Sequence, residues 1–496
     1  MKRLNLLVVG MLMSSAYLLA GGLVTNTNQS AAWARTLSRN ASLDIDGVYF
    51  NPAGLGFMSN GLHLSLSNQT IFQTRSITSD FFQQLGNEPI TYEAELTAPI
   101  FPSIYAAYKM DKWAFSAGFN VIGGGGSADF KTGLPSFEIP VASLVPVMQG
   151  MLGQLDSEMI NAGAPDFGYR NISSYDMNAA FQGSSNYFGI QLGATYAIND
   201  FLSVAIGGRY VMANNSYEGS LSDVMIDGDG PQAWAGGAAT PGDYMRAVAA
   251  NPLLPPDVKN DLNYFGGALD VLTADADLKA TQSGTGFTPI IGVNLHLSDM
   301  INIAARYEHH TKIELTNDTE VDDVGMFPDG EKVRADLPGM FAFGAQLKPL
   351  KKLSASLGID YFLDKSAFYG NVNESGEQIN NESTIDENGF SFHGSLEYKF
   401  LGILGVSAGY SYSNNGVNDS YQSDLSYALS SNTIAGGVFV DVGELLTINA
   451  GFSYVMYDDY SKAQSYQLPE MPVVIDYTDT YTKETMLFAI GVDIHL

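Results

Sequence analysis

The histidines, acidic residues and glycines of this chain offer few arrangements that could do chemistry. His309 and His310 follow Glu308 directly, but neighbours on an extended strand point to opposite sides and cannot readily hold one metal ion. The run from Asp227 to Gly230 resembles the start of a calcium loop but lacks the closing glutamate. There is no Gly-x-Ser-x-Gly sequence, although a serine–histidine pair formed only in space would leave little local signature. We expect no enzyme activity and no metal or other cofactor.

Three basic residues could bind an anionic group instead. Arg209, Arg306 and Lys399 lie in segments where apolar and polar side chains alternate, and in a closed barrel the phase of Arg209 and Arg306 points inward. There they could hold the carboxylate of an acidic ligand. The alternative is an internal ion-pair network, because the same phase points carboxylates inward at Glu308, Asp360 and Glu397.

The elements that position these residues are strands. From Gly61 onward, segments of about ten residues alternate between apolar and small or polar side chains, which is typical of membrane barrels. The last segment is apolar at every second position from Met486 to Leu496. The pattern predicts about fourteen antiparallel strands, an even number that places both ends of the chain in the periplasm. The fold class is therefore all-β, a transmembrane barrel.

The connections between the predicted strands alternate between short and long, as they do in outer-membrane barrels. Two connections, 123–185 and 218–278, are exceptionally long and contain apolar residues at helical spacing. These helices could pack on each other as a lid, or they could present an adaptable apolar surface that captures a hydrophobic ligand. The candidate ligand-contacting residues among them are Met148, Met151, Leu152 and Phe265.

Composition agrees with export to an outer membrane. The 496 residues include 27 Tyr and 27 Phe and no cysteine, so disulfides and thiolate metal sites are excluded. Lys2 and Arg3 precede an apolar stretch that ends near Ala20, which predicts a secretory signal over residues 1–20. After this stretch, no segment has the run of about 18 apolar residues that a membrane helix needs. The net charge of −29 argues against nucleic acid as a partner.

The segment between the signal and the first strand carries a family resemblance. Asp44 to Gly56 reads DIDGVYFNPAGLG, with Asn51, Pro52 and Ala53 in its centre. This segment resembles the N-terminal plug of the FadL family of outer-membrane transporters for long-chain fatty acids and other hydrophobic compounds. The resemblance implies a signal at 1–20, a plug or hatch at 21–60 and a barrel at 61–496. It also implies hydrophobic small molecules as ligands, fatty acids or hydrocarbons.

The same resemblance implies a route for the ligand. Extracellular loops capture it, an interior pocket binds it, the plug moves, and the ligand leaves sideways at a kinked third strand. The third predicted strand runs into Gly123, Gly124 and Gly125, which could form this lateral gate or simply a flexible loop hinge. The expected surroundings are outer-membrane lipid, lipopolysaccharide and, during biogenesis, the barrel assembly machinery. The alternative function is a surface adhesin or antigen that displays its loops on a barrel.

Overall fold

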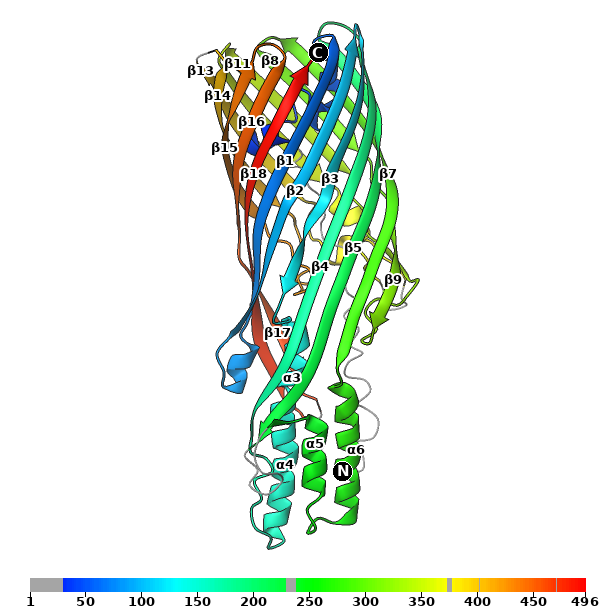
Figure 1. The fold of residues 1–496 in the computed structure, drawn as a ribbon, viewed down its shortest axis with the longest axis vertical. Coiled ribbons are helices and arrows are strands. Elements are labelled where there is room, and N and C mark those ends of the chain that lie inside the picture. The colour runs from blue at the N-terminus through cyan, green and yellow to red at the C-terminus, as the bar shows by residue number, and fades with distance from the viewer. Residues whose placement is uncertain (1–29, 229–237, 373–376, 401, 470) are drawn as a thin grey trace.

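The computed structural model describes residues 30–228, 238–372, 377–400, 402–469 and 471–496. The predicted secretory signal, residues 1–20, lies outside them. Within the described residues, 18 strands form one sheet, and fourteen of them close into an antiparallel barrel (Figure 1). The fold class and the number of strands predicted from alternation are confirmed. The barrel strands are β1 (Gly61–Ser79), β2 (Ile90–Met110), β3 (Trp113–Phe130), β4 (Ile172–Ala197), β5 (Leu202–Gly228), β7 (Ala276–Ser298), β8 (Ile301–Glu308), β11 (Met340–Leu350), β12 (Leu353–Phe362), β13 (Phe390–Phe400), β14 (Leu404–Asn414), β15 (Ser431–Val442), β16 (Leu446–Tyr457) and β18 (Val474–His495).

The barrel closes where its first and last strands meet. β1 pairs with β18 over seventeen positions, from His63 opposite His495 to Ser79 opposite Asp479. The four shorter strands extend the wall beyond the closed cylinder: β6 (Ala238–Ala239), β9 (Glu314–Asp322), β10 (Lys332–Arg334) and β17 (Tyr460–Gln467).

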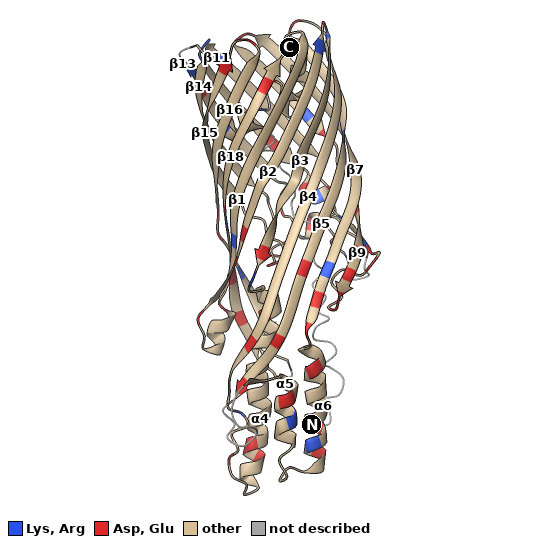
Figure 2. Cartoon of the chain, in the orientation of Figure 1, with Lys and Arg blue, Asp and Glu red and all other residues tan. Residues whose placement is uncertain are grey.

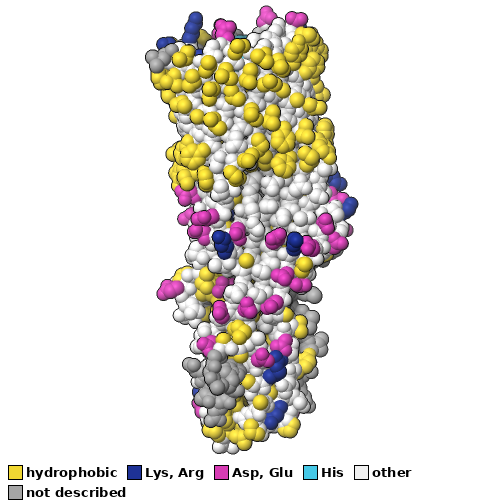
Figure 3. All heavy atoms as spheres, viewed as in Figure 1, with side chains coloured by type: hydrophobic (Ala, Val, Ile, Leu, Met, Phe, Trp, Pro, Cys, Tyr) yellow, Lys and Arg dark blue, Asp and Glu magenta, His cyan; other side chains and the backbone are white. Residues whose placement is uncertain are grey.

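The period-2 alternation separates the two faces of the wall. Alternate apolar side chains point outward, such as Leu357, which is 64% exposed, and Ile490, which is 63% exposed. Together they form an apolar band at the end of the barrel that holds the short turns and the C-terminus (Figure 3). Because short turns are periplasmic in outer-membrane barrels, the long connections lie at the extracellular end.

The strands continue well past the apolar band, which shortens the two long connections. β3 continues to Phe130 and β4 begins at Ile172, so the connection is 131–171 rather than the predicted 123–185. β5 continues to Gly228 and β7 begins at Ala276, which gives 229–275 rather than 218–278. These strand ends lack the apolar alternation because both of their faces are outside the membrane. Acidic residues are frequent on them (Figure 2).

Helices cap this extracellular extension. They are α3 (Pro135–Ala142), α4 (Leu144–Asn161), α5 (Pro241–Ala249) and α6 (Pro256–Leu272), with the short 3-10 helices η3 (Phe81–Leu85), η4 (Asp364–Ser366) and η5 (Asn381–Ser383) nearer the barrel. Pro146 falls in the first turn of α4, where its missing N–H is not needed. No described helix is long and apolar enough to cross a membrane.

Residues 30–60, the lumenal segment, lie inside the barrel (Figure 1). They form α1 (Ala31–Thr36), α2 (Gly47–Phe50) and η2 (Pro52–Phe57). Inward hydroxyl groups bind the backbone of this segment: Ser453 Oγ donates to the Ala34 carbonyl at 2.7 Å, and Ser203 Oγ donates to the Ala53 carbonyl at 2.6 Å. At Gly409 on β14, an added Cβ would overlap the Thr36 carbonyl. Glycine on the wall therefore permits this close approach.

Candidate functional site

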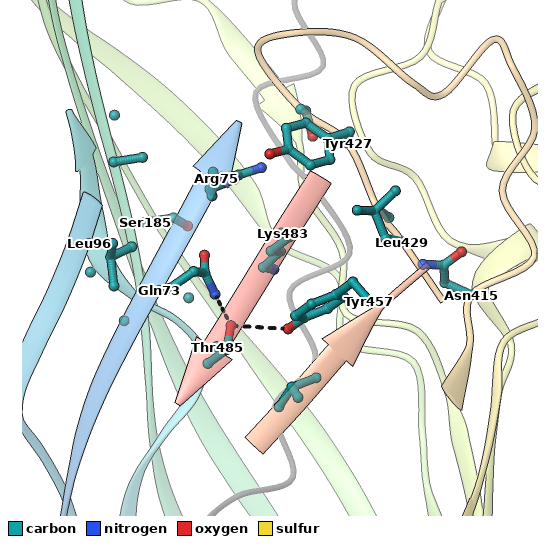
Figure 4. Close-up of a pocket in the computed structure, with 18 of the residues that line it drawn as sticks. Gln73, Arg75, Leu96, Ser185, Asn415, Tyr427, Leu429, Tyr457, Lys483 and Thr485 are labelled. Atoms are coloured by element: carbon teal, nitrogen blue, oxygen red, sulfur yellow. Dashed lines mark hydrogen bonds between the residues drawn. The ribbon is translucent and has the colours of Figure 1, made fainter. Parts of the chain in front are cut away.

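The barrel contains an inner chamber on the extracellular side of the lumenal segment. Its volume is about 550 Å³, and Trp33 of the lumenal segment contributes to its lining. Apolar side chains such as Leu96 and Leu429 and polar groups from β1, β16 and β18 both line it (Figure 4). Ile71 and Leu487 add to the apolar part of the lining. A chamber with both apolar and polar groups in its lining suits an amphipathic ligand.

Two cations face this chamber without carboxylate partners. Arg75 on β1 and Lys483 on β18 are register partners, and both line the chamber (Figure 4). In the described part of the chain, no ion pair within 4.0 Å joins either of them to a carboxylate. Like charges directly opposite on paired strands destabilise a sheet. A bound anion would offset this repulsion and favour the charged form of both groups.

Aromatic rings stabilise the two cations without neutralising them. The Arg75 guanidinium lies 4.6 Å from the centre of the Tyr427 ring, and the Lys483 ammonium lies 4.8 Å from the centre of the Tyr457 ring. The Arg75 Nε is buried and has no hydrogen-bond acceptor. Hydrogen-bonding capacity is therefore left over for a ligand.

Two carboxyl groups also line the inner chamber, from loops beyond the strands. Burial raises the pKa of Asp364 to about 6 and raises the pKa of Asp424. These groups are therefore easier to protonate than exposed carboxylates, and they offset the two cations less than exposed carboxylates would.

A larger outer chamber of about 920 Å³ lies between the inner chamber and the extracellular helices. Its lining is mainly apolar and includes Val141 and Leu144 near the α3–α4 junction and Leu272 at the end of α6. The two chambers share a wall, which we call the septum. The septum consists of Phe181, Met326, Phe327, Asp424 and Leu425.

The inner chamber also reaches an interruption in the barrel wall between β2 and β3. These strands pair at Ala94–Phe130 and again from Ser103–Asn120, and no register pair joins them between those positions. Pro99 in this stretch of β2 has no N–H to donate. We call this stretch the β2–β3 gap.

The predicted gate glycines lie along the gap. Gly123, Gly124 and Gly125 are in β3, where the pairing with β4 shifts register twice. Gly124 and Gly125 have φ values of 67° and 110°, a region that favours glycine. An added Cβ at Gly125 would overlap the Phe101 ring, so side chains from β2 fill the gap. The loop-hinge alternative does not fit this segment, because it is strand.

The structure places two of the predicted ligand cations in an internal network instead. Arg209 Nη1 pairs with Glu308 Oε2 at 2.6 Å, and Arg306 Nε lies 3.3 Å from Glu308 Oε1. Arg306 also donates to the Tyr49 carbonyl of the lumenal segment, and both guanidinium groups lie over the Tyr49 ring. Neither arginine lines the inner or the outer chamber. The structure thus shows these two arginines in the ion-pair network. Their binding of a ligand stays a prediction.

Glu308 is the carboxylate on which this network depends. Replacing Glu308 with alanine is expected to cost about 3–5 kcal/mol of unfolding free energy, because two buried guanidinium groups lose their counter-charge. Glu320, which pairs with Lys279 in an exposed ion pair at 2.5 Å, is the matched control. Glu320→Ala should cost less than about 1 kcal/mol. Urea unfolding in lipid vesicles measures both, and equal costs would show that Arg209 and Arg306 do not need Glu308.

Lys399 lies near the periplasmic end, where it pairs with Asp441. It lines a third cavity, of about 320 Å³, together with Arg35, Arg39 and Glu397. There Arg35 pairs with Glu397, and Arg39 Nε pairs with Asp46 Oδ2 at 2.7 Å. These ion pairs fasten the lumenal segment to itself and to the wall.

The four apolar loop candidates belong to the extracellular helices. Met148, Leu152 and Phe265 are buried in one apolar cluster with α5, and Met151 packs against its edge. None of the four lines the inner or the outer chamber. The helices therefore pack on each other, as the lid alternative expects. Capture of a ligand by these four residues stays a prediction.

The motif that carried the family resemblance has a clear structural role. The Asn51 amide donates to the Ser42 carbonyl at 3.0 Å and to Asn294 Oδ1 at 2.8 Å, and its Oδ1 accepts from the Gly54 N–H. Pro52 begins η2, where a proline is favoured, and Ala53 is fully buried beside Gly292. The motif caps a turn and ties it to the barrel wall.

Arg75 and Lys483 were missed because the predicted strands stopped short of them. The alternation that begins at Gly61 predicts a strand of about ten residues, but β1 continues to Ser79. Ile71 and Gln73 point into the barrel, and Arg75 is the next residue on the same face of β1. Continuing the alternation by two residues therefore predicts that Arg75 points inward. On β18, Leu487 and Thr485 point into the barrel, and Lys483 is the preceding residue on the same face.

These features define a closed outer-membrane β-barrel with an occupied lumen, two stacked chambers and an interrupted wall. No group of three or more histidine or acidic side chains suited to a metal ion occurs in the described residues. No sequence-family model and no curated protein matches the chain.

Solved structures do match. The fold is similar to that of a Pseudomonas aeruginosa FadL homologue, with a TM-score of 0.59, 12% identity and coverage of 96% of this chain and 99% of that one. It is also similar to the Pseudomonas putida toluene transporter TodX, with a TM-score of 0.53, 13% identity and coverage of 96% and 100%. The chain therefore has the fold of the FadL-type outer-membrane transporters, which confirms the expectation from residues 44–56. This fold belongs to the outer membrane of Gram-negative bacteria.

Proposed function

We propose that the protein is a passive outer-membrane transporter of hydrophobic compounds with an acidic head group, with long-chain fatty acids as the substrate class. The observation that carries the proposal is the Arg75–Lys483 pair, two cations without carboxylate ion-pair partners on the wall of a chamber that both apolar and polar side chains line. The similarity to FadL-type structures supports transport as the general role.

The chemistry of a fatty acid matches the chamber. Each CH₂ of an acyl chain that is buried against apolar side chains of the lining contributes about 0.8 kcal/mol. Hydrogen bonds from charged donors to the carboxylate contribute about 1.5–3 kcal/mol each. Arg75 pairs across the sheet with Ala94, the last β2 residue paired with β3 before the gap. A bound head group would therefore lie at the extracellular end of the gap, with its tail directed along the gap.

The proposed route has three steps. A ligand enters the outer chamber, passes the septum and binds in the inner chamber with its head group at Arg75 and Lys483. The lumenal segment acts as the plug below the inner chamber, and the ligand leaves through the β2–β3 gap into the membrane. Lateral exit keeps the acyl chain out of water, which a water-filled pore would not do.

The test compares ligands that differ only in charge. The wild-type protein in detergent is titrated with a long-chain fatty acid and with the alcohol of the same chain length, each displacing a fluorescent fatty acid. The acid should bind at least about tenfold more tightly, because one charge-assisted contact accounts for that factor. Equal affinities would favour neutral compounds, such as the toluene named for the TodX structure. No binding of either ligand would contradict transport and favour surface display.

A further inference from the structure

The septum between the two chambers is built around one aromatic side chain. Phe327 is 3% exposed and lines both chambers. It lies in the turn 323–331, which joins β9 to β10 and folds back against the barrel wall. Its ring stacks on Tyr217 of β5, with centroids 4.5 Å apart and planes 17° apart.

The aromatic contact continues across the wall to the extracellular helices. Tyr217 stacks on Phe181 of β4, and Phe181 meets Phe137 of α3 edge to face, with ring centres 5.7 Å apart. Phe137 lines the outer chamber. The ring of Phe327 is thus the inner end of a row of aromatic rings that starts beside the outer chamber.

Specific hydrogen bonds hold the turn in place. The Asp322 carboxylate accepts the N–H groups of Met326 and Phe327 at 2.8 and 2.7 Å. Thr319 Oγ1 donates to the Phe327 carbonyl at 2.6 Å, and Asn317 donates to the Pro328 carbonyl at 3.0 Å. The backbone on both sides of the ring is therefore fixed, while the ring itself is held by stacking and by packing in an apolar cluster that includes Phe181 and Leu278.

The other half of the septum comes from a different loop. Leu425 and Asp424 line both chambers, and Asp424 Oδ2 accepts the Ser136 N–H at the start of α3 at 2.7 Å. The septum thus joins the loop 415–430, the turn 323–331 and β4. A ligand that moves between the chambers must displace a side chain of this set, and the Phe327 ring, which is the largest of those on the two loops, can turn while its hydrogen-bonded backbone stays fixed.

We propose that Phe327 is the specificity-determining residue of the passage between the chambers, admitting slim acyl or flat aromatic ligands and delaying bulky ones. This inference rests on the proposed function and adds to it a selection step by cross-section before the head group reaches Arg75 and Lys483. Selection here acts on the rate of entry, because Phe327 is displaced during passage.

The experiment measures association rates by stopped-flow fluorescence on the full-length protein in detergent. Two probes are used, a linear polyene fatty acid and a fatty acid with a pyrene group at its tail. In the wild type, the polyene probe should associate at least about tenfold faster than the pyrene probe. Phe327→Ala should reduce this ratio to within about threefold, mainly by accelerating the pyrene probe.

Three further variants separate gating from general loosening. Phe327→Leu keeps an apolar closure and should retain most of the wild-type ratio. Asp322→Ala removes the acceptor of two turn N–H groups without changing the lining of either chamber, and it should lower the ratio. Glu320→Ala changes an exposed residue of β9 that lines neither chamber, and it should leave the ratio unchanged.

The outcomes distinguish this inference from the function on which it rests. An unchanged ratio in Phe327→Ala, with both probes bound by wild type, overturns the gate and leaves the transporter intact. Equal rates for both probes in the wild type also overturn it. Failure of the wild type to bind either probe overturns the proposed function and the gate together. Retained heat-modifiable migration on gels shows that each variant still forms the barrel.

Discussion

Replacing both Arg75 and Lys483 with methionine is expected to abolish the preference of the protein for a fatty acid over the alcohol of the same length. Each cation contributes at least about 1.5 kcal/mol to a bound carboxylate. Together they correspond to about a hundredfold in affinity. Methionine keeps an unbranched apolar side chain at both positions, so the binding of the alcohol should change little. Displacement titrations with the two ligands measure the effect.

The same variants give a second readout that a purely structural pair would not give. Arg75 and Lys483 are directly opposed on β1 and β18, so their repulsion opposes pairing of the first and last strands. Single replacement of either one should leave the unfolding free energy unchanged or raise it by up to about 1 kcal/mol. These replacements are therefore expected to weaken binding of the fatty acid without lowering the unfolding free energy, as expected of residues retained for a ligand.

Lys399→Met is the matched control. Lys399 is also a lumenal lysine, but it pairs with Asp441 and lines the periplasmic cavity rather than the inner chamber. Its replacement should preserve the preference for the acid. If Lys399→Met removes the preference and the Arg75–Lys483 double variant keeps it, the head group binds at the periplasmic end and the assignment made here is wrong.

The barrel itself was predictable because its main determinant is local. One face of each strand meets lipid, and this imposes apolar side chains at every second position, as from Met486 to Leu496. The alternation ends where the strand leaves the membrane. The pattern therefore does not predict the strand ends beyond the apolar band, which include Arg75 and Gly126.

The choice among lumenal cations was not predictable from strand phase. Phase shows that Arg209 points inward, but its partner Glu308 lies on β8, across the intervening strand β7. Pairing of this kind depends on register across several strands, which the sequence does not display. The septum is harder still to predict, because Phe327 reaches Tyr217 through a turn more than a hundred positions away in sequence.

The glycines at 123–125 stand out in the sequence as a possible break in a strand, whereas the prolines opposite them on β2 do not. Pro99 and Pro102 flank Phe101 in a strand that otherwise alternates normally. Proline in a strand interior removes a ladder hydrogen bond. Prolines on one strand and glycines on the next together produce the gap, and only the structure shows that the two lie side by side.

A disulfide across the β2–β3 gap is expected to stop uptake, and reduction is expected to restore it. The proposed variant is Leu96→Cys with Gly126→Cys, in a chain that has no cysteine of its own. A Cβ built on Gly126 lies 2.7 Å from Cγ of Leu96. Adding one bond of about 1.5 Å places the two Cβ atoms no more than about 4.2 Å apart, within the range that disulfides need.

The expected effect is large because the two cysteines lie on opposite sides of the proposed exit. Leu96, Gly125 and Gly126 all line the inner chamber, so a bond between 96 and 126 closes the gap without entering the head-group site. Uptake of a labelled fatty acid by cells should fall to the level of cells that lack the protein. Binding to the purified protein should persist, because Arg75 and Lys483 are untouched.

A second cysteine pair controls for the bond itself. Ser103 and Asn120 are already register partners on the periplasmic side of the gap, so a disulfide there fixes strands that are paired in any case. Uptake through this control should be the same before and after reduction. If the 96–126 disulfide forms fully and uptake continues, the ligand does not leave through the wall. An axial path past the lumenal segment would then be required, and opening of its ion pairs at Arg35 and Arg39 would become the limiting step.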